Sequence, residues 1–147
     1  MLIYEYKMVK TRVAEDVYGQ KISGDYDASK VAHEYYSHLF AREQEVFSII
    51  MLNTKQEVIG IYEVSMGTLD SAIVHPRDVL KPLILASAAG YIAVHNHPSG
   101  NLNPSPEDYA LTRRLKQASE IVGIRLLDHL IINESGDTRS LASMGAI

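Results

Sequence analysis

The pattern of apolar and polar positions predicts several β-strands along the chain. Residues 2–9 alternate, with apolar or aromatic side chains at every second position, as expected for a half-buried strand. Two apolar segments joined around the sequence NTKQ indicate a hairpin. Residues 91–97 contain little polarity, which is typical of a central strand buried on both faces. The strands expected from this pattern are residues 2–9, 47–52, 58–64, 91–97 and 124–133, with a short strand or frayed end at 140–147.

A period of 3.6 residues predicts three helices between these strands. The first follows a turn at residues 23–29 and runs to about Glu43, the second opens at His75-Pro76, and the third begins at Ser105 and ends before Gly123. The side chains expected to face inward are Val31, Tyr35 and Leu39 in the first helix, Leu80, Leu83, Ile84 and Ser87 in the second, and Leu111, Leu115, Ala118 and Val122 in the third. The order β-α-β-β-α-β-α-β predicts an α/β fold with a mixed central sheet flanked by helices.

The length and composition fit one soluble domain spanning residues 1–147. No apolar run reaches the roughly 18 residues needed to cross a bilayer, and the N-terminus lacks the layout of a signal peptide. We therefore expect a cytoplasmic protein with no membrane partner. The net charge of −4 argues against nucleic acid as a partner of this domain alone. Because the chain has no cysteine, disulfides, thiol nucleophiles and every cysteine-based zinc site are excluded.

The segment AVHNHPSGNLNPSPED, residues 93–108, carries the strongest chemical signal. Residues two apart on a strand point to the same face, so His95 and His97 present two imidazoles side by side. Ser105 is suited to cap the following helix, and Asp108, at its third position, can turn a carboxylate back toward the helix start. Two imidazoles and one carboxylate would leave one coordination position open, as in catalytic zinc sites.

A purely structural interpretation of the same residues is also available. Ser-x-x-Asp before an apolar stretch is an acidic form of the capping box, which occurs without any chemistry. A capped helix does not, however, require two histidines on one face of the preceding strand. The capping role and the metal-binding role can also coexist in Ser105 and Asp108.

His-x-His, seven residues, Ser, two residues and Asp together resemble the motif of the JAB/MPN metallopeptidases, the JAMM family. The strings GTLDSAIVHPRDV, HNHPSG and LLDHLIIN are similar to the RadC-like branch of that family, over roughly residues 45–133. The resemblance implies an α/β fold related in architecture to the cytidine deaminases. It also implies one zinc ion per chain, held by His95, His97 and Asp108.

The resemblance further implies a glutamate on an upstream strand that acts as general base. In VIGIYEVSMGT the candidate is Glu63, an acid within an apolar segment, although an edge-strand residue facing solvent would look the same. Zinc would activate the water, Glu63 would carry its proton to the leaving amine, and Ser105 would stabilise the oxyanion. Asp128 and His129 have two possible roles. They could form a polar pair at the end of a strand, or one of them could orient a zinc-bound imidazole. Strand alternation allows only one of the two to face the site.

The leading functional hypothesis is a zinc metallopeptidase that cleaves peptide or isopeptide bonds in a peptide or protein substrate. The alternatives are a catalytically silent MPN-type binding module and a DNA-repair-associated accessory protein. Full-length RadC-like proteins usually carry an N-terminal helix-hairpin-helix region. The roughly 45 residues before the metal domain contain no Gly-rich hairpin between helices, which argues against such a domain and against DNA binding. A deaminase is excluded because its Pro-Cys-x-x-Cys ligands are absent.

Overall fold

A computed structural model describes residues 1–5, 17–37, 44–67 and 74–147. Within these ranges the elements are α1 (Asp25–Tyr36), β1 (Glu45–Leu52), β2 (Val58–Gly67), α2 (Pro76–Leu85), β3 (Gly90–Asn96), α3 (Pro106–Val122), β4 (Arg125–Ile132) and β5 (Thr138–Ser140). The strands form one sheet in the order β2-β1-β3-β4-β5. Only the β3–β4 pairing is parallel, so the sheet is mixed. The predicted α/β fold with a mixed sheet flanked by helices is confirmed.

Strand β3 lies at the centre of the sheet, between β1 and β4, and all seven of its residues are buried. This confirms the expectation drawn from the low polarity of that segment, since a strand covered on both faces carries apolar residues on both. The hairpin of β1 and β2 is also confirmed, and a turn at Asn53–Gln56 closes it, with the Asn53 side chain accepting from the backbone N–H groups of Lys55 and Glu57.

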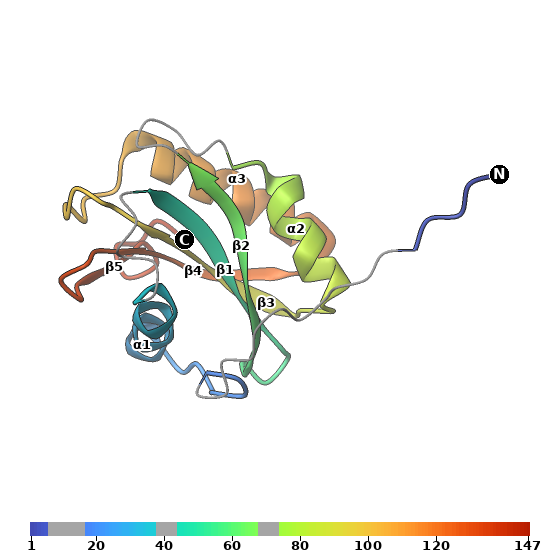
Figure 1. Cartoon of the computed structure of the whole chain (residues 1–147), viewed down its shortest axis with the longest axis horizontal. Helices are drawn as coiled ribbons and strands as arrows, with labels where there is room; N and C mark the ends of the chain where they lie inside the picture. The colour runs from blue at the N-terminus through green and yellow to red at the C-terminus, as the bar shows by residue number, and fades with distance from the viewer. Residues whose placement is uncertain (6–16, 38–43, 68–73) are drawn as a thin grey trace.

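Helix α1 covers one face of the sheet, and helices α2 and α3 cover the other (Figure 1). Alternate residues of the central strands therefore belong to two separate apolar clusters. Ile92 and Val94 pack on the α1 face, whereas Tyr91 and Ala93 pack on the α2/α3 face. His95 continues the second series and so lies on the α2/α3 face.

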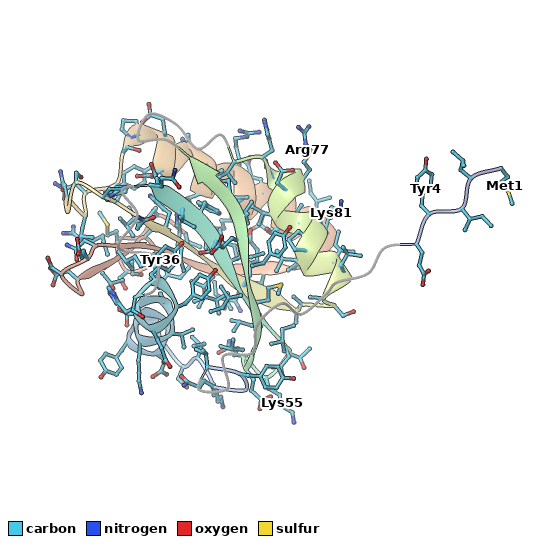
Figure 2. All side chains as sticks on the ribbon, viewed as in Figure 1. Met1, Tyr4, Tyr36, Lys55, Arg77 and Lys81 are labelled. Atoms are coloured by element: carbon cyan, nitrogen blue, oxygen red, sulfur yellow. The ribbon has the colours of Figure 1, made fainter. Side chains whose placement is uncertain are left out.

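Tyr36 fixes helix α1 against the sheet. Its ring is buried at the end of the helix that faces the strands (Figure 2). Its hydroxyl lies within hydrogen-bonding distance of the carbonyls of Val46 and Val94, at 2.9 and 3.0 Å, and contacts Ser48. The hydroxyl thereby joins α1 to both β1 and β3. A buried tyrosine needs such partners because an unsatisfied hydroxyl in an apolar setting is costly.

The inward faces of α2 and α3 agree in part with those predicted, since Leu83 and Leu115 are buried and Leu80 and Leu111 pack partly buried against the core. In α2 the buried residues are Val79, Pro82 and Leu83, whereas Ile84 and Ser87 are exposed. In α3 the buried face is Asp108, Thr112, Leu115 and Ser119, spaced i, i+4, i+7 and i+11, and Val122 is exposed. The prediction was wrong for Ile84, Ser87 and Val122, and it missed the polar side chains that α3 buries together with their hydrogen-bond partners.

The two ends of the chain also depart from the predicted elements. Residues 2–5 are exposed and outside any strand, while residues 6–9, and the predicted extension of the first helix through 38–43, lie outside the described residues. The final strand, β5, precedes most of the predicted 140–147 segment, in which residues 141–145 form turns. Among the described residues, no helix has both the length and the apolar character that a membrane crossing requires.

Candidate metal centre

Two imidazoles meet at the end of the central strand β3. His95 is the penultimate residue of β3 and is 2% exposed, and His97 follows directly, with its backbone N–H donating to the carbonyl of Ile132 in β4. The ring centroids lie 4.8 Å apart, and the two Nε2 atoms face one another at 2.9 Å. Strand alternation therefore produces the side-by-side pair that the sequence predicts.

Helix α3 adds a carboxylate to this pair through its N-terminal capping box. The Ser105 Oγ atom accepts from the Asp108 N–H at 3.1 Å, and Asp108 Oδ2 accepts from the Ser105 N–H at 2.7 Å. This reciprocal capping holds the Asp108 carboxylate at the helix start. From there its Oδ1 lies 3.2 Å from His95 Nε2, and its Oδ2 lies 3.4 Å from His97 Nε2. The capping role and the place in the cluster coexist in Asp108.

A second carboxylate, Glu45, reaches the same point from the first residue of β1. Its Oε1 lies 3.7 Å from His95 Nε2, and its side chain is 23% exposed. Within the described ranges, Glu45, His95, His97 and Asp108 are the group of histidine and acidic side chains whose ligand atoms converge, all within 4.8 Å of one another. The sequence interpretation missed Glu45. The available signal was its place at the start of a buried strand, two residues before Phe47 on the face that Phe47 shares with His95.

Asn96 holds the beginning of β1 beside the histidines. Its side chain points to the face opposite His95, where Oδ1 accepts from the Val46 N–H at 2.7 Å and Nδ2 donates to the Gln44 carbonyl at 3.0 Å. These two bonds bracket Glu45 in the sequence. The residue between the two histidines therefore positions the backbone that carries the second carboxylate.

Three of the four side chains, those of His95, His97 and Asp108, fit a small divalent cation. In a tetrahedral zinc site with bonds of about 2.0–2.1 Å, neighbouring ligand atoms lie about 3.3–3.4 Å apart. The separations among His95 Nε2, His97 Nε2 and the Asp108 carboxylate are 2.9, 3.2 and 3.4 Å. The Nδ1–H of His97 donates to the Asn101 carbonyl at 2.6 Å, so a neutral His97 ring directs its lone pair into the cluster. Two imidazoles with a carboxylate are also a donor set that zinc accepts.

The side chains of His129 and Asp128 point to opposite faces of the sheet, as the alternation of a strand requires. His129 faces the cluster, fully buried, with its Nε2 atom 2.8 Å from His95 Nδ1. Asp128 points to the opposite face, where its carboxylate accepts from the Ser140 hydroxyl and from the backbone N–H groups of His129 and Ala142. Burial raises the pKa of Asp128, and these donors partly offset the rise. Asp128 thus fixes the C-terminal turn, and His129 alone of the two contacts a candidate ligand.

The pKa values of the side chains in and beside the cluster reflect burial and the contacts among them. Burial alone would raise the pKa of Asp108, but its contacts with the imidazoles of His95 and His97 outweigh that effect and hold the pKa well below its usual range. The hydrogen bond that His97 donates to Asp108 raises the pKa of His97, although partial burial opposes the rise. Burial, reinforced by His95, lowers the pKa of His129 well below the ordinary value. His129 is therefore a neutral ring beside the cluster.

Glu63, predicted as the general base, lies away from the cluster. It pairs with Ser48 across the β1–β2 hairpin, on the face covered by α1, and its exposed carboxylate accepts from the Tyr35 hydroxyl at 2.7 Å. His95 is on the other face of the sheet. The register of the hairpin shifts between Phe47 and Ser48. Because of this shift, the alternation of residues along β2 does not by itself predict which face of the sheet each side chain occupies. The structure thus corrects the placement of Glu63.

Ser105 lies close to the cluster through its bond with Asp108. Its hydroxyl oxygen accepts from the Asp108 N–H, and a hydroxyl that accepts keeps its own hydrogen to donate. Among the described residues, no hydrogen bond donated by this hydroxyl is seen. Ser105 therefore has a donor available next to the carboxylate.

The mixed sheet with helices on both faces, and a His-x-His pair meeting a helix-start aspartate, define a JAB-type domain. The RadC-like JAB domain family matches residues 26–146 of the chain. The chain belongs to this family, and the resemblance stated from its motifs is confirmed.

Curated relatives of the chain are proteins described as UPF0758. The one from Thermotoga maritima is 44% identical over 117 residues, covering 80% of this chain and 53% of the relative. The one from Desulforamulus reducens is 50% identical over 105 residues, covering 71% and 46%. The one from Clostridioides difficile is 48% identical over 100 residues, covering 68% and 43%. The chain spans about half the length of these relatives.

Proposed function

We propose that the protein is a metal-dependent hydrolase that cleaves peptide or isopeptide bonds in a peptide or protein substrate. The observation that carries the proposal is the convergence of His95, His97, Asp108 and Glu45 within 4.8 Å, on a domain of the JAB family. Two imidazoles and one carboxylate are the usual protein ligands of a hydrolytic zinc ion, which leave a position open. In this proposal His95, His97 and Asp108 hold the zinc.

A zinc ion held there would supply a Lewis acid that makes water a competent nucleophile near neutral pH. The protein residues supply the ligand geometry and the proton transfers. The capping box fixes Asp108, the Asn101 carbonyl fixes the ring of His97, and the Phe47 ring stacks on His95 at a centroid distance of 6.0 Å. Ligands held in this way need little reorganisation when the metal binds.

Glu45 is the general base in this proposal, in place of Glu63. Its Oε1 approaches His95 Nε2 at 3.7 Å, farther than either Asp108 contact, and its side chain is more exposed than that of Asp108. A carboxylate beside the ligands and open to solvent can reach a water molecule that enters the site. Glu45 accepts the proton of the attacking water and passes it to the leaving amine nitrogen as the scissile C–N bond breaks.

Ser105 stabilises the negative oxygen that develops on the substrate carbonyl. Its oxygen is already held by the Asp108 N–H, so its hydrogen is free to donate to that oxygen. A single donor of this kind contributes about 3–4 kcal/mol to known acyl-transfer reactions. Substrate binding and catalysis then depend on Glu45 and Ser105, whereas metal binding depends on the other three residues.

Glu45→Gln and Glu63→Gln form a matched pair that tests the proposal. Both variants replace a carboxylate with an amide on neighbouring strands, and the amide at position 63 can still accept from Tyr35. For the zinc-loaded Glu45→Gln protein we expect hydrolysis to fall about 10²-fold or more, with the zinc content unchanged. For Glu63→Gln we expect activity close to that of the wild type.

Zinc content, melting temperature and hydrolysis of peptide and isopeptide libraries are measured on the same preparations. An equal loss of activity in both variants, or a loss confined to Glu63→Gln, contradicts the assignment of Glu45. Zinc-loaded wild-type protein that cleaves no member of either library indicates a silent binding module instead.

A further inference from the structure

A chain of buried hydrogen bonds runs from the His95 ring into helix α3. His95 Nδ1 lies 2.8 Å from His129 Nε2, and His129 Nδ1 lies 2.6 Å from the Thr112 hydroxyl oxygen. The Thr112 hydroxyl in turn donates to the Asp108 carbonyl at 2.7 Å. Three buried side chains form this series of hydrogen bonds, and each is at most 2% exposed: His95, His129 and Thr112. The path starts at one candidate metal ligand and ends on the backbone of another.

The Asp108 carbonyl, the last group in this series of hydrogen bonds, determines which atom donates in every bond. The Asp108 carbonyl can only accept, so it takes the single hydrogen of the Thr112 hydroxyl. The Thr112 oxygen must then accept from His129, which places the hydrogen of that ring on Nδ1. A second ring hydrogen would give His129 a charge while fully buried, and its ring nitrogens face only a histidine and a hydroxyl.

The Nε2 atom of neutral His129 is consequently an acceptor. It receives the hydrogen on His95 Nδ1, so that a neutral His95 ring carries its lone pair on Nε2, the atom that faces His97 and Asp108. The Phe47 ring restricts both imidazoles, stacking on His95 with an interplanar angle of 19° and meeting His129 edge-on at 5.6 Å. Packing therefore fixes the ring planes, and the hydrogen-bond chain fixes which nitrogen carries the hydrogen.

We propose that Thr112 is a positioning residue for the candidate metal centre, which acts through His129 to commit His95 Nδ1 as a donor and His95 Nε2 as a metal ligand. The same hydroxyl bonds the carbonyl of Asp108, so one side chain couples the placement of two ligands on different elements. The inference rests on the proposed function in so far as the cluster holds a metal ion.

An ordinary helical role for Thr112 is the alternative. Threonine in a helix often donates to the carbonyl four residues earlier, and such a bond alone has no bearing on a metal site. The 2.6 Å contact with His129 distinguishes the two roles, because it makes the Thr112 oxygen an acceptor as well. A merely structural threonine would affect stability but not metal affinity or the protonation of His95.

Three variants separate these roles. Thr112→Val keeps the shape of the side chain and removes both the donor and the acceptor, whereas Thr112→Ser keeps the hydroxyl. Ser119→Ala is the matched control, since Ser119 lies two turns later on the same buried face of α3 and bonds the Tyr91 hydroxyl at 2.7 Å, outside the chain to His95.

Zinc affinity is measured by competition with a chelator, and the protonation of His95 by ¹⁵N NMR on zinc-free and zinc-loaded protein. We expect Thr112→Val to lose about 10- to 100-fold in zinc affinity, the usual effect of removing a group that orients a ligand. Thr112→Ser and Ser119→Ala should stay close to the wild type. His95 Nδ1 should carry a hydrogen in both forms of the wild-type protein.

Wild-type zinc affinity in folded Thr112→Val, or an equal loss in Ser119→Ala, overturns the proposal. The absence of a hydrogen on His95 Nδ1 in the wild-type protein also overturns the proposal. This NMR measurement requires neither a folded variant nor bound metal. If the wild type binds zinc but hydrolyses nothing, the proposed function fails while the role of Thr112 is still decided by affinity.

Discussion

Replacing Asp108 with asparagine separates the two roles of this side chain. The carboxylate caps α3 through the 2.7 Å bond from the Ser105 N–H, and the oxygen of an amide can accept the same bond. We therefore expect the metal-free Asn variant to lose at most about 1 kcal/mol of unfolding free energy from capping. Asp108→Ala removes the acceptor as well and should cost about 1–2 kcal/mol more.

The effect of Asp108→Asn on the metal should be much larger. Both carboxylate oxygens face imidazole nitrogens, at 3.2 and 3.4 Å, so the side chain supplies the negative charge between the two histidines. A neutral amide is a poor zinc ligand, and we expect zinc affinity to fall at least about 100-fold, or about 2.8 kcal/mol. Chelator competition measures the affinity, and urea unfolding in excess chelator measures the metal-free stability.

Ser105→Ala is the control for capping without loss of charge. It removes the oxygen that accepts from the Asp108 N–H at 3.1 Å and leaves the carboxylate in place. It should destabilise the protein by about 1 kcal/mol while zinc affinity stays near the wild-type value. If Asp108→Asn holds zinc as tightly as the wild type, Asp108 is only a helix cap and the reasoning about the site fails.

Two further predictions concern pH and the strand that carries Glu45. The raised pKa of His97 reflects its ion pair with Asp108, a carboxylate whose own pKa is lowered by both His95 and His97. The stabilisation that the His97–Asp108 pair gives the metal-free fold is lost as pH falls through the pKa of folded Asp108 and as pH rises through that of folded His97. The stability gap between wild type and Asp108→Asn should therefore be larger near pH 5 than near pH 8 in urea unfolding. Zinc affinity should weaken as pH drops from about 7.5 to about 5.5, because protons compete for His97, and an affinity independent of pH contradicts this ligand. Asn96→Ala leaves the buried Val46 N–H without its acceptor and should cost about 1–3 kcal/mol, with turnover reduced more than zinc content; unchanged stability and turnover would remove Asn96 from the account.

The sequence was sufficient to predict the part of the site that depends on local geometry. His95 and His97 share a face because a strand repeats every two residues, and Ser105 and Asp108 meet because a capping box has a fixed spacing. The central strand, buried on both faces, was equally predictable, since β3 is apolar apart from the Tyr91 hydroxyl and the last two residues, His95 and Asn96. These features require no knowledge of how distant segments are arranged.

The position of the second carboxylate depended on the pairing of two strands. Glu45 and Glu63 both lie on strands of the hairpin, but the register shift between Phe47 and Ser48 sets the face of Glu63 relative to that of Glu45. No alternation pattern within either strand reveals that shift. Glu63 was predicted as the base because it interrupts an apolar segment. Glu45 lies at the start of a strand, where an acidic residue is common and gives no signal in the sequence.

The hydrogen-bond chain behind His95 was hidden for a different reason. Thr112 and Ser119 are polar, so an apolar stripe was sought elsewhere on α3, although their spacing from Asp108 by 4 and 11 residues marks one helical face. Burial of a hydroxyl is favourable only when its partners are in place, and those partners, His129 and Tyr91, come from the sheet.

The most direct test of the account is a crystal structure of the zinc-loaded protein with anomalous scattering recorded at the zinc edge. We expect one anomalous peak per chain, bonded to His95 Nε2, His97 Nε2 and an Asp108 oxygen at about 2.0–2.2 Å, with Glu45 beside it and Glu63 on the opposite face of the sheet. A peak at other residues, or none in protein prepared with excess zinc, would contradict the assignment of this cluster as the metal centre.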